Sequence, residues 1–174
     1  MVIMKLLALV ILLLVSLSAA AGTTTLALPG NTTLIFDAPE MTKVKEASDG
    51  SHYQYVATSL GGADERFNLS VYVEPIECQY GKSLRDVARC FTDRLASIPG
   101  IVNAEDKPSC SRKRCDILYV TTEKSSDRQV RQLHVNSLFI YLDTWIDVHF
   151  SVVDPKSEDS NVMARFEATL KFMH

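Results

Sequence analysis

Apolar and polar residues alternate along several stretches of the chain, which is the pattern of strands that bury one face. The cleanest alternation runs through residues 67–73, where every second side chain is apolar. Upstream, residues 42–47 and 52–59 flank an Asp-Gly pair, and such a pair supplies the positive φ angles of a tight hairpin turn. The pattern therefore predicts a hairpin followed by a third strand.

Apolar residues recur at helical spacing in two other places. Between residues 83 and 98 they form one stripe, which predicts an amphipathic helix. Ser83 at its start, with Asp86 three residues later, has the arrangement of a capping box, and Pro99-Gly100 ends the helix. A second helix is expected from about residue 157 to 172.

Three more strands are expected between the two helices, at residues 115–123, 129–141 and 145–153. Consecutive strands joined by short turns pair in antiparallel fashion, and helices then pack on the sheet. The sequence thus predicts an α+β fold with a mainly antiparallel sheet of about six strands and two principal helices. We expect a single domain at 34–174, preceded by a flexible leader at 22–33, which is rich in Thr and Gly.

The first 21 residues have the three parts of a secretory signal peptide. Lys5 is followed by an apolar run over residues 6–17 and then by small residues, with the expected cut after Ala21. The apolar run is shorter than the about 20 residues of a membrane-spanning helix, which favours cleavage over a retained anchor. We therefore expect a periplasmic or secreted protein of 174 − 21 = 153 residues, with no permanent membrane anchor.

The expected export changes the interpretation of the four cysteines, Cys78, Cys90, Cys110 and Cys115. An even number of cysteines in an exported chain predicts two disulfides, and three pairings are possible. We favour Cys78–Cys90, which would tie a loop to the helix that follows it, together with Cys110–Cys115, which would close a hairpin. Zinc is the rival interpretation, but this spacing, without clustered histidines, is poor for a zinc site.

The charge balance excludes one class of function. The chain has 18 basic and 21 acidic residues, and without Lys5 the net charge is 17 − 21 = −4. Nucleic-acid binding requires a basic stripe that neutralises phosphates, so we expect no nucleic-acid partner.

The last two strands carry the residues that most resemble a chemical site. If the turn between these strands has an even number of residues, His134 and Asn136 share a face with Asp147 and His149. Two histidines and a carboxylate could bind a divalent metal or transfer protons. Trp145 lies on the same face, could wall a pocket, and is a candidate contact for a partner. The alternative is an ordinary polar sheet face, and an odd turn length would separate the group.

A basic hairpin tip is the other candidate site. Arg112, Lys113 and Arg114 lie between two cysteines and could contact an acidic partner or an anionic surface. Arg128 and Arg131 would extend this basic patch if the neighbouring strand lay beside it. The alternative is a tip that is merely solvated.

The order of elements resembles that of a known fold family. The signal peptide comes first, and early hairpins that end in the segment 67–71 follow it. The amphipathic helix 83–98 comes next. Then come the strands that end in 145–150, Asp154-Pro155 and a closing helix that ends in 170–172. In this arrangement the chain is similar to the PsbP-like fold, which includes DcrB-type exported bacterial proteins.

The resemblance implies an antiparallel sheet flanked by helices, and its members are mostly binding or accessory proteins. Some are subunits of larger assemblies, and others are immunity proteins against antibacterial toxins. The fold has no shared catalytic residues to carry over, and the four cysteines depart from the family's pattern.

From these observations we expect an exported, non-enzymatic binding or accessory protein that acts through protein–protein contacts and needs no cofactor. An inhibitor or immunity protein is one concrete form of this function. The first alternative is a metal-binding protein or metal-dependent hydrolase built on His134, Asp147 and His149. The second is a domain that binds a small ligand or lipid in a cavity between sheet and helix.

Overall fold

The computed structural model describes residues 22–59, 66–104, 108–125 and 128–174. The expected signal peptide, residues 1–21, lies outside these ranges. Among the described residues, the elements in order are β1 (Gly22–Leu28), β2 (Thr32–Ala38), β3 (Met41–Ser48), β4 (Tyr53–Ser59), β5 (Phe67–Pro75), α1 (Leu84–Ala96), β6 (Ile101–Ala104), β7 (Ser109–Cys110), β8 (Cys115–Ser125), β9 (Arg128–Tyr141), β10 (Thr144–Val153), α2 (Asp159–Thr169) and β11 (Lys171–Met173).

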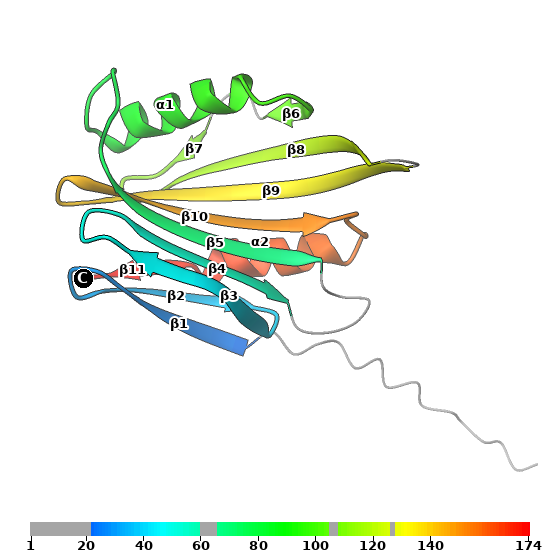
Figure 1. Ribbon diagram of the computed structural model, residues 1–174, viewed down its shortest axis with the longest axis horizontal. Coiled ribbons are helices and arrows are strands. Elements are labelled where there is room, and N and C mark those ends of the chain that lie inside the picture. The colour runs from blue at the N-terminus through cyan, green and yellow to red at the C-terminus, as the bar shows by residue number, and fades with distance from the viewer. Residues whose placement is uncertain (1–21, 60–65, 105–107, 126–127) are drawn as a thin grey trace, which may run out of the picture.

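The strands form two antiparallel sheets in the described part of the chain (Figure 1). The larger sheet has eight strands, in the order β3-β4-β5-β10-β9-β8-β6, with β7 paired to β8. The smaller sheet has the order β1-β2-β11. The α+β class, the antiparallel pairing and the two helices were predicted correctly, but the sequence pattern missed the second sheet.

The local predictions around α1 and the first hairpin are confirmed. Ser83 Oγ accepts a hydrogen bond from the Asp86 backbone N–H at 3.2 Å, and the Asp86 carboxylate accepts one from the Ser83 N–H at 3.2 Å. These two bonds form the capping box and satisfy donors that the first turn leaves free. Strands β3 and β4 are joined through Gly50, which adopts a φ of 89°.

The expectation of a flexible leader at 22–33 is wrong, because this segment is part of the smaller sheet. Strand β1 pairs along its whole length with β2, and the turn between them includes Gly30 and Asn31, both with positive φ. In β2, Leu34 and Phe36 are almost fully buried. The threonines that suggested a loose segment are β-branched, and such residues favour strands when a partner strand is present.

The expected closing helix is also shorter than the pattern indicated. Helix α2 ends at Thr169, Leu170 is extended, and the next three residues form β11, which pairs with β2. Leu170 is buried, whereas Met173 is 53% exposed. Beyond the helix, Phe172 packs against Phe139 and Tyr141 from β9, with ring centroids 5.7 and 5.6 Å away.

The larger sheet separates two apolar cores. On one face the smaller sheet and α2 cover it, and Phe166 of α2 stacks on Phe150 with centroids 4.4 Å apart. On the other face α1 packs over β8, β9 and β10, where it buries Leu138 and Trp145. Strand β9 therefore buries side chains on both faces, with Leu138 facing α1 and Phe139 facing the smaller sheet.

Both expected disulfides are present and pair as favoured. Cys78–Cys90 ties the loop before α1 to the helix, and Cys110–Cys115 closes the hairpin between β7 and β8. Disulfides of this kind are typical of oxidising, extracytoplasmic compartments. Neither helix in the described residues is long and apolar enough to cross a membrane.

Candidate functional sites

The turn between β9 and β10 decides whether the predicted polar group shares a face. Tyr141 pairs with Thr144, so only Leu142 and Asp143 form the turn. An even turn keeps the strands in the register in which the polar positions face the same side. The prediction that the two histidines, Asn136 and Asp147 share a face is confirmed.

The two histidines are joined in a hydrogen-bonded chain that crosses four strands. His134 Nδ1 lies 2.9 Å from His149 Nε2, and the rings stack with centroids 5.1 Å apart. At one end, the Thr121 hydroxyl lies 2.8 Å from His134 Nε2, and at the other, the Ser70 hydroxyl lies 3.3 Å from His149 Nδ1. Tyr119 stacks on the His134 ring at 4.5 Å.

Burial keeps this histidine pair neutral. Desolvation lowers the pKa of His134 to about 4. Desolvation and the neighbouring His134 lower the pKa of His149 to about 3. A neutral imidazole has one donor and one acceptor nitrogen, so each ring can donate one hydrogen bond along the chain and accept another.

Asp147 does not join the histidines. Its Oδ1 accepts a hydrogen bond from Asn136 Nδ2 at 2.7 Å. Burial raises the pKa of Asp147 to about 7, the Asn136 bond opposes this rise, and the charge of Glu74 adds to it. Among the residues that the structure describes, no group of three or more His, Cys, Asp or Glu side chains could hold a metal ion. The residues that suggested a metal site thus share a face without forming a ligand set.

The basic tip divides into one anchored and two free side chains. Arg114 is half-buried, with Nε 2.9 Å from Asp116 Oδ2, and its Nη1 donates to the Glu167 carbonyl at the end of α2 at 2.7 Å. Arg112 and Lys113 are exposed, and no carboxylate pairs with either in the described residues. Arg114 therefore positions the hairpin against α2, while Arg112 and Lys113 remain available to a partner.

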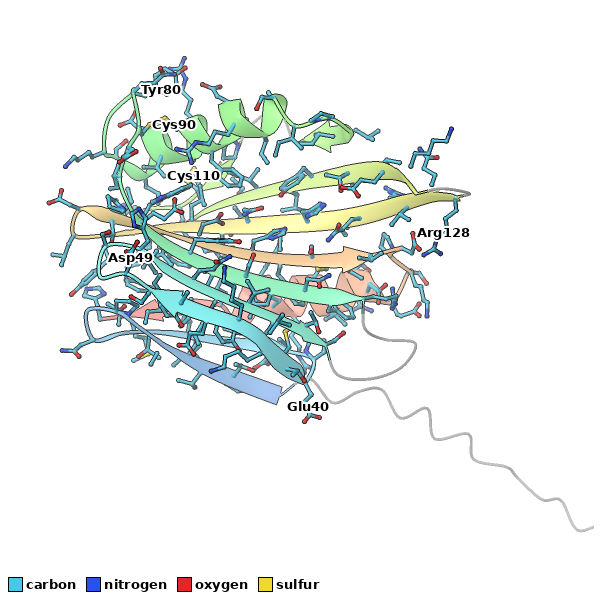
Figure 2. The ribbon with its side chains drawn as sticks, viewed as in Figure 1. Glu40, Asp49, Tyr80, Cys90, Cys110 and Arg128 are labelled. Carbon is cyan, nitrogen blue, oxygen red and sulfur yellow. A yellow bond between two sulfur atoms is a disulfide. The ribbon has the colours of Figure 1, made fainter. Side chains whose placement is uncertain are left out.

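These side chains border the basic groove, a hollow of about 990 Å³. The start of α1 and strand β11, which contribute to its lining, lie at the same end of the larger sheet (Figure 1). Figure 2 marks the hairpin on its border by the Cys110 label. Its charged side chains are five basic and one acidic: Lys82, Arg112, Lys113, Arg114, Lys171 and Asp116. Its large apolar side chains are Leu84, Phe139, Ile140, Leu170, Phe172 and Met173.

The sequence pattern missed the apolar part of the basic groove. The pattern predicts a helix as far as residue 172, so it does not indicate that residues 170–172 lie beside the hairpin tip. The repeated aromatic and apolar residues at the C-terminal end of the chain were the only signal.

The expected extension of the basic patch by Arg128 and Arg131 is wrong. Strand β8 pairs antiparallel with β9, so Arg128 lies opposite Ser125, while the basic tip precedes Cys115. The eleven residues of β8 place these two ends roughly 30 Å apart at about 3.3 Å per residue.

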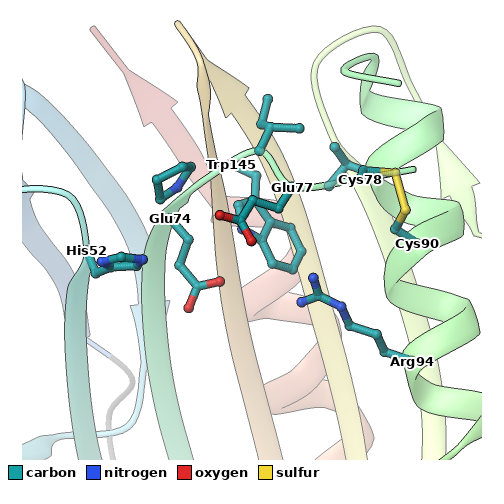
Figure 3. Close-up of a pocket in the computed structure, with 10 residues that line it drawn as sticks. His52, Glu74, Glu77, Cys78, Cys90, Arg94 and Trp145 are labelled. Atoms are coloured by element: carbon teal, nitrogen blue, oxygen red, sulfur yellow. A yellow bond between two sulfur atoms is a disulfide. The ribbon is translucent and has the colours of Figure 1, made fainter. Parts of the chain in front are cut away.

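Trp145 lies in a different hollow, a pocket of about 100 Å³ between β5, β10 and α1 (Figure 3). The indole is 8% exposed, Phe91 packs against it edge-on at 6.1 Å, and the Arg94 guanidinium lies 5.5 Å from the ring centroid. Glu74 and Glu77 also line this pocket. The two candidate contacts, Trp145 and the basic tip, therefore lie in separate hollows.

No protein-family model matches the chain, and no curated protein matches it in sequence. The structure is similar to the Ran-binding protein Mog1p of Saccharomyces cerevisiae, with a TM-score of 0.55 and 15% identity over 87% of this chain and 96% of that one. A point mutant of Mog1 gives a TM-score of 0.55 and 15% identity over 86% and 95% of the two chains. LpqN of Mycobacterium tuberculosis, described as involved in cell envelope biogenesis, has a TM-score of 0.49 and 10% identity over 89% and 92%.

The similarity to Mog1p defines the fold class. The chain has the α+β fold of the Mog1p/PsbP-like group, as its order of elements predicted. At 15% identity the likeness concerns the fold alone.

Proposed function

We propose that this protein is an exported, non-enzymatic binding or accessory protein that holds an acidic segment of a partner protein in the basic groove. The observation that carries the proposal is the composition of the groove, which combines basic side chains with a large apolar surface. Protein-recognition surfaces combine apolar and charged side chains in this way.

The charge of the groove favours an acidic partner. The whole chain has a net charge of −3, yet five of the six charged side chains in the groove are basic. Asp116 neutralises Arg114, and Asp143 pairs with Lys82 at 3.0 Å. Arg112, Lys113 and Lys171 have no carboxylate partner among the described residues, and carboxylates of a partner would complement them.

The apolar surface favours a protein segment over a free inorganic anion. Phe172 is half-buried and Met173 is 53% exposed, so both can contact a guest. A volume of about 990 Å³ accommodates several side chains of a peptide, which a small anion would leave unfilled.

Two further observations agree with this function. The fold serves protein recognition in the Ran-binding protein Mog1p, although its residues do not carry over at this identity. The two disulfides fit the periplasmic or secreted location that the N-terminal residues predict. An inhibitor or immunity protein, which would form a stoichiometric complex, is one form of the proposed function.

Site-specific photo-crosslinking in the native host tests the proposal. A crosslinking amino acid at position 173 should capture a partner, and mass spectrometry should place the crosslink on an acidic segment. The R112E/K113E variant should lose this crosslink. The K124E/R131E variant has the same change of net charge, at the far end of β8 and in the neighbouring β9, and should retain it. Crosslinks unaffected by R112E/K113E, or falling on segments without acidic residues, would refute the proposed contact.

A further inference from the structure

One strand of the larger sheet has an open edge inside the basic groove. Strand β9 is longer than its neighbour β8, whose first residue, Cys115, pairs with Leu138. Residues 139–141 of β9 continue to pair with β10 on one side. On the other side no strand in the described part of the chain pairs with them.

The open edge faces the groove. Phe139 and Ile140 both line it, with the hairpin tip that precedes β8 on one side and β11 on the other. In a strand, backbone N–H and C=O groups of alternate residues point to the same side. Part of the backbone of residues 139–141 therefore presents hydrogen-bonding groups towards the place that a longer β8 would occupy.

We propose that the acidic segment of the partner binds as an added β-strand along residues 139–141, in the position where β8 is missing. This inference rests on the proposed function and specifies how the same groove recognises its partner. Main-chain hydrogen bonds from the open edge would supply affinity, and the flanking side chains would supply specificity.

The side chains around the edge define the sequence of such a strand. Ile140 packs with the core under α1, and Phe139 packs with the core under the smaller sheet. Side chains of an added strand alternate between the same two directions. On one side they meet Lys82 and Leu84, and on the other Phe172, whose ring contacts Phe139. Lys82 thus favours acidic residues in one direction and Phe172 favours apolar residues in the other, which fits a segment in which the two kinds of residue alternate.

Another exposed edge of the sheet shows the contrast. Strand β3 is exposed along almost its whole length, but it carries Lys43 and Lys45 and has an irregular register between them. Lysines and bulges are the usual means by which proteins prevent strand addition at an edge. The edge at residues 139–141 consists of Phe139, Ile140 and Tyr141, so it carries no lysine, and its register with β10 is regular. Phe139 is buried, and Ile140 and Tyr141 are half-buried.

The test uses the full chain after signal removal and synthetic peptides of about six residues, the usual length of a strand. The probe is a capped peptide in which glutamate and valine alternate, and its matched control has the same side chains on a fully N-methylated backbone. Fluorescence anisotropy should show binding of the probe and a loss of at least ~10-fold for the control, because two or more hydrogen bonds are removed. Hydrogen exchange of amides within residues 139–141 should slow when the probe binds.

The outcomes separate the mode of binding from the function itself. Equal affinity for the two peptides, with loss of binding in R112E/K113E but not in K124E/R131E, would overturn strand addition and leave the groove as the binding site. Failure of the acidic probe to bind the native protein would overturn both. Binding of phosphatidylglycerol vesicles that competes with the probe and is stronger would overturn the choice of a protein partner.

Discussion

Replacement of His149 by glutamine should flatten the pH dependence of stability between about pH 6.5 and 4. Both buried histidines have an ordinary pKa of 6.5, lowered in the folded protein to about 4 for His134 and about 3 for His149. In this interval the unfolded chain binds protons that the folded chain does not. Stability due to the histidines is therefore present above pH 6.5 and is lost as the pH falls towards their folded pKa values.

Asp147 acts in the opposite direction. Burial raises its pKa from 3.8 to about 7, so the folded protein holds a proton that the unfolded chain has released. Its contribution is fully present below pH 3.8 and is lost as the pH rises through 7. Between pH 6.5 and 4, Asp147 thus offsets one of the two histidines, and these three groups together take up about one proton on unfolding.

The size of each effect follows from this proton count. One proton corresponds to about 1.4 kcal/mol per pH unit, so the three groups should cost the native protein about 3 kcal/mol over two pH units. In the His149→Gln variant, the proton taken up by His134 on unfolding is offset by the proton released by Asp147. The contribution of these two groups to the slope of stability against pH should therefore be about zero. The Asp147→Asn variant retains both histidines, so its loss should rise to about 5–6 kcal/mol over the same interval.

Urea unfolding at several pH values, with the disulfides intact, measures these slopes. Other carboxylates contribute equally to all three proteins, so differences between the slopes isolate the buried group. The two variants should deviate from the native slope in opposite directions. Identical slopes in all three proteins, or a steeper slope for His149→Gln, would refute the linkage between burial of these residues and acid sensitivity.

Three other predictions concern the core, an ion pair and the disulfides. Phe150→Ala should lower the free energy of unfolding by about 3–5 kcal/mol, because the ring is fully buried and stacks on Phe67 and Phe166; urea unfolding tests this, and a loss under about 1 kcal/mol would contradict it. Asp159→Asn should cost about 3 kcal/mol, since it leaves the half-buried Arg66 without the carboxylate that lies 2.7 Å away; thermal unfolding is the assay, and an unchanged midpoint would count against it. Reduction of both disulfides should lower the melting temperature without unfolding the domain at room temperature, because the two cores remain; circular dichroism in reductant would show the opposite if the cores were insufficient.

The sequence predicted those features whose cause lies within a few residues. Gly50 turns the β3–β4 hairpin, and Ser83 with Asp86 starts α1, each through contacts that span three or four positions. The alternation of apolar residues in β5 likewise indicated its buried face, whereas β9 and β10 bury side chains on both faces, which their alternation did not indicate. Both disulfides close short loops, so their spacing was informative as well.

The candidate sites were predicted only as sets of residues. The even turn placed the two histidines and Asp147 on one face, as the sequence allowed. It could not show that the histidines bond to each other while Asp147 bonds to Asn136. Such choices depend on side-chain rotamers and on burial under α1, neither of which appears in the order of residues.

What the sequence determined by itself is the α+β class, the antiparallel pairing, the capped first helix and the two disulfides. Only the tertiary structure decided the fate of the two ends of the described chain: residues 22–28 and 171–173 become strands because both pair with β2. The basic groove and its open edge exist because β11 and the hairpin tip at residues 111–114 meet at the end of β9. These segments are far apart in sequence, and their conformations are stabilised by backbone hydrogen bonds and burial that neither can supply alone.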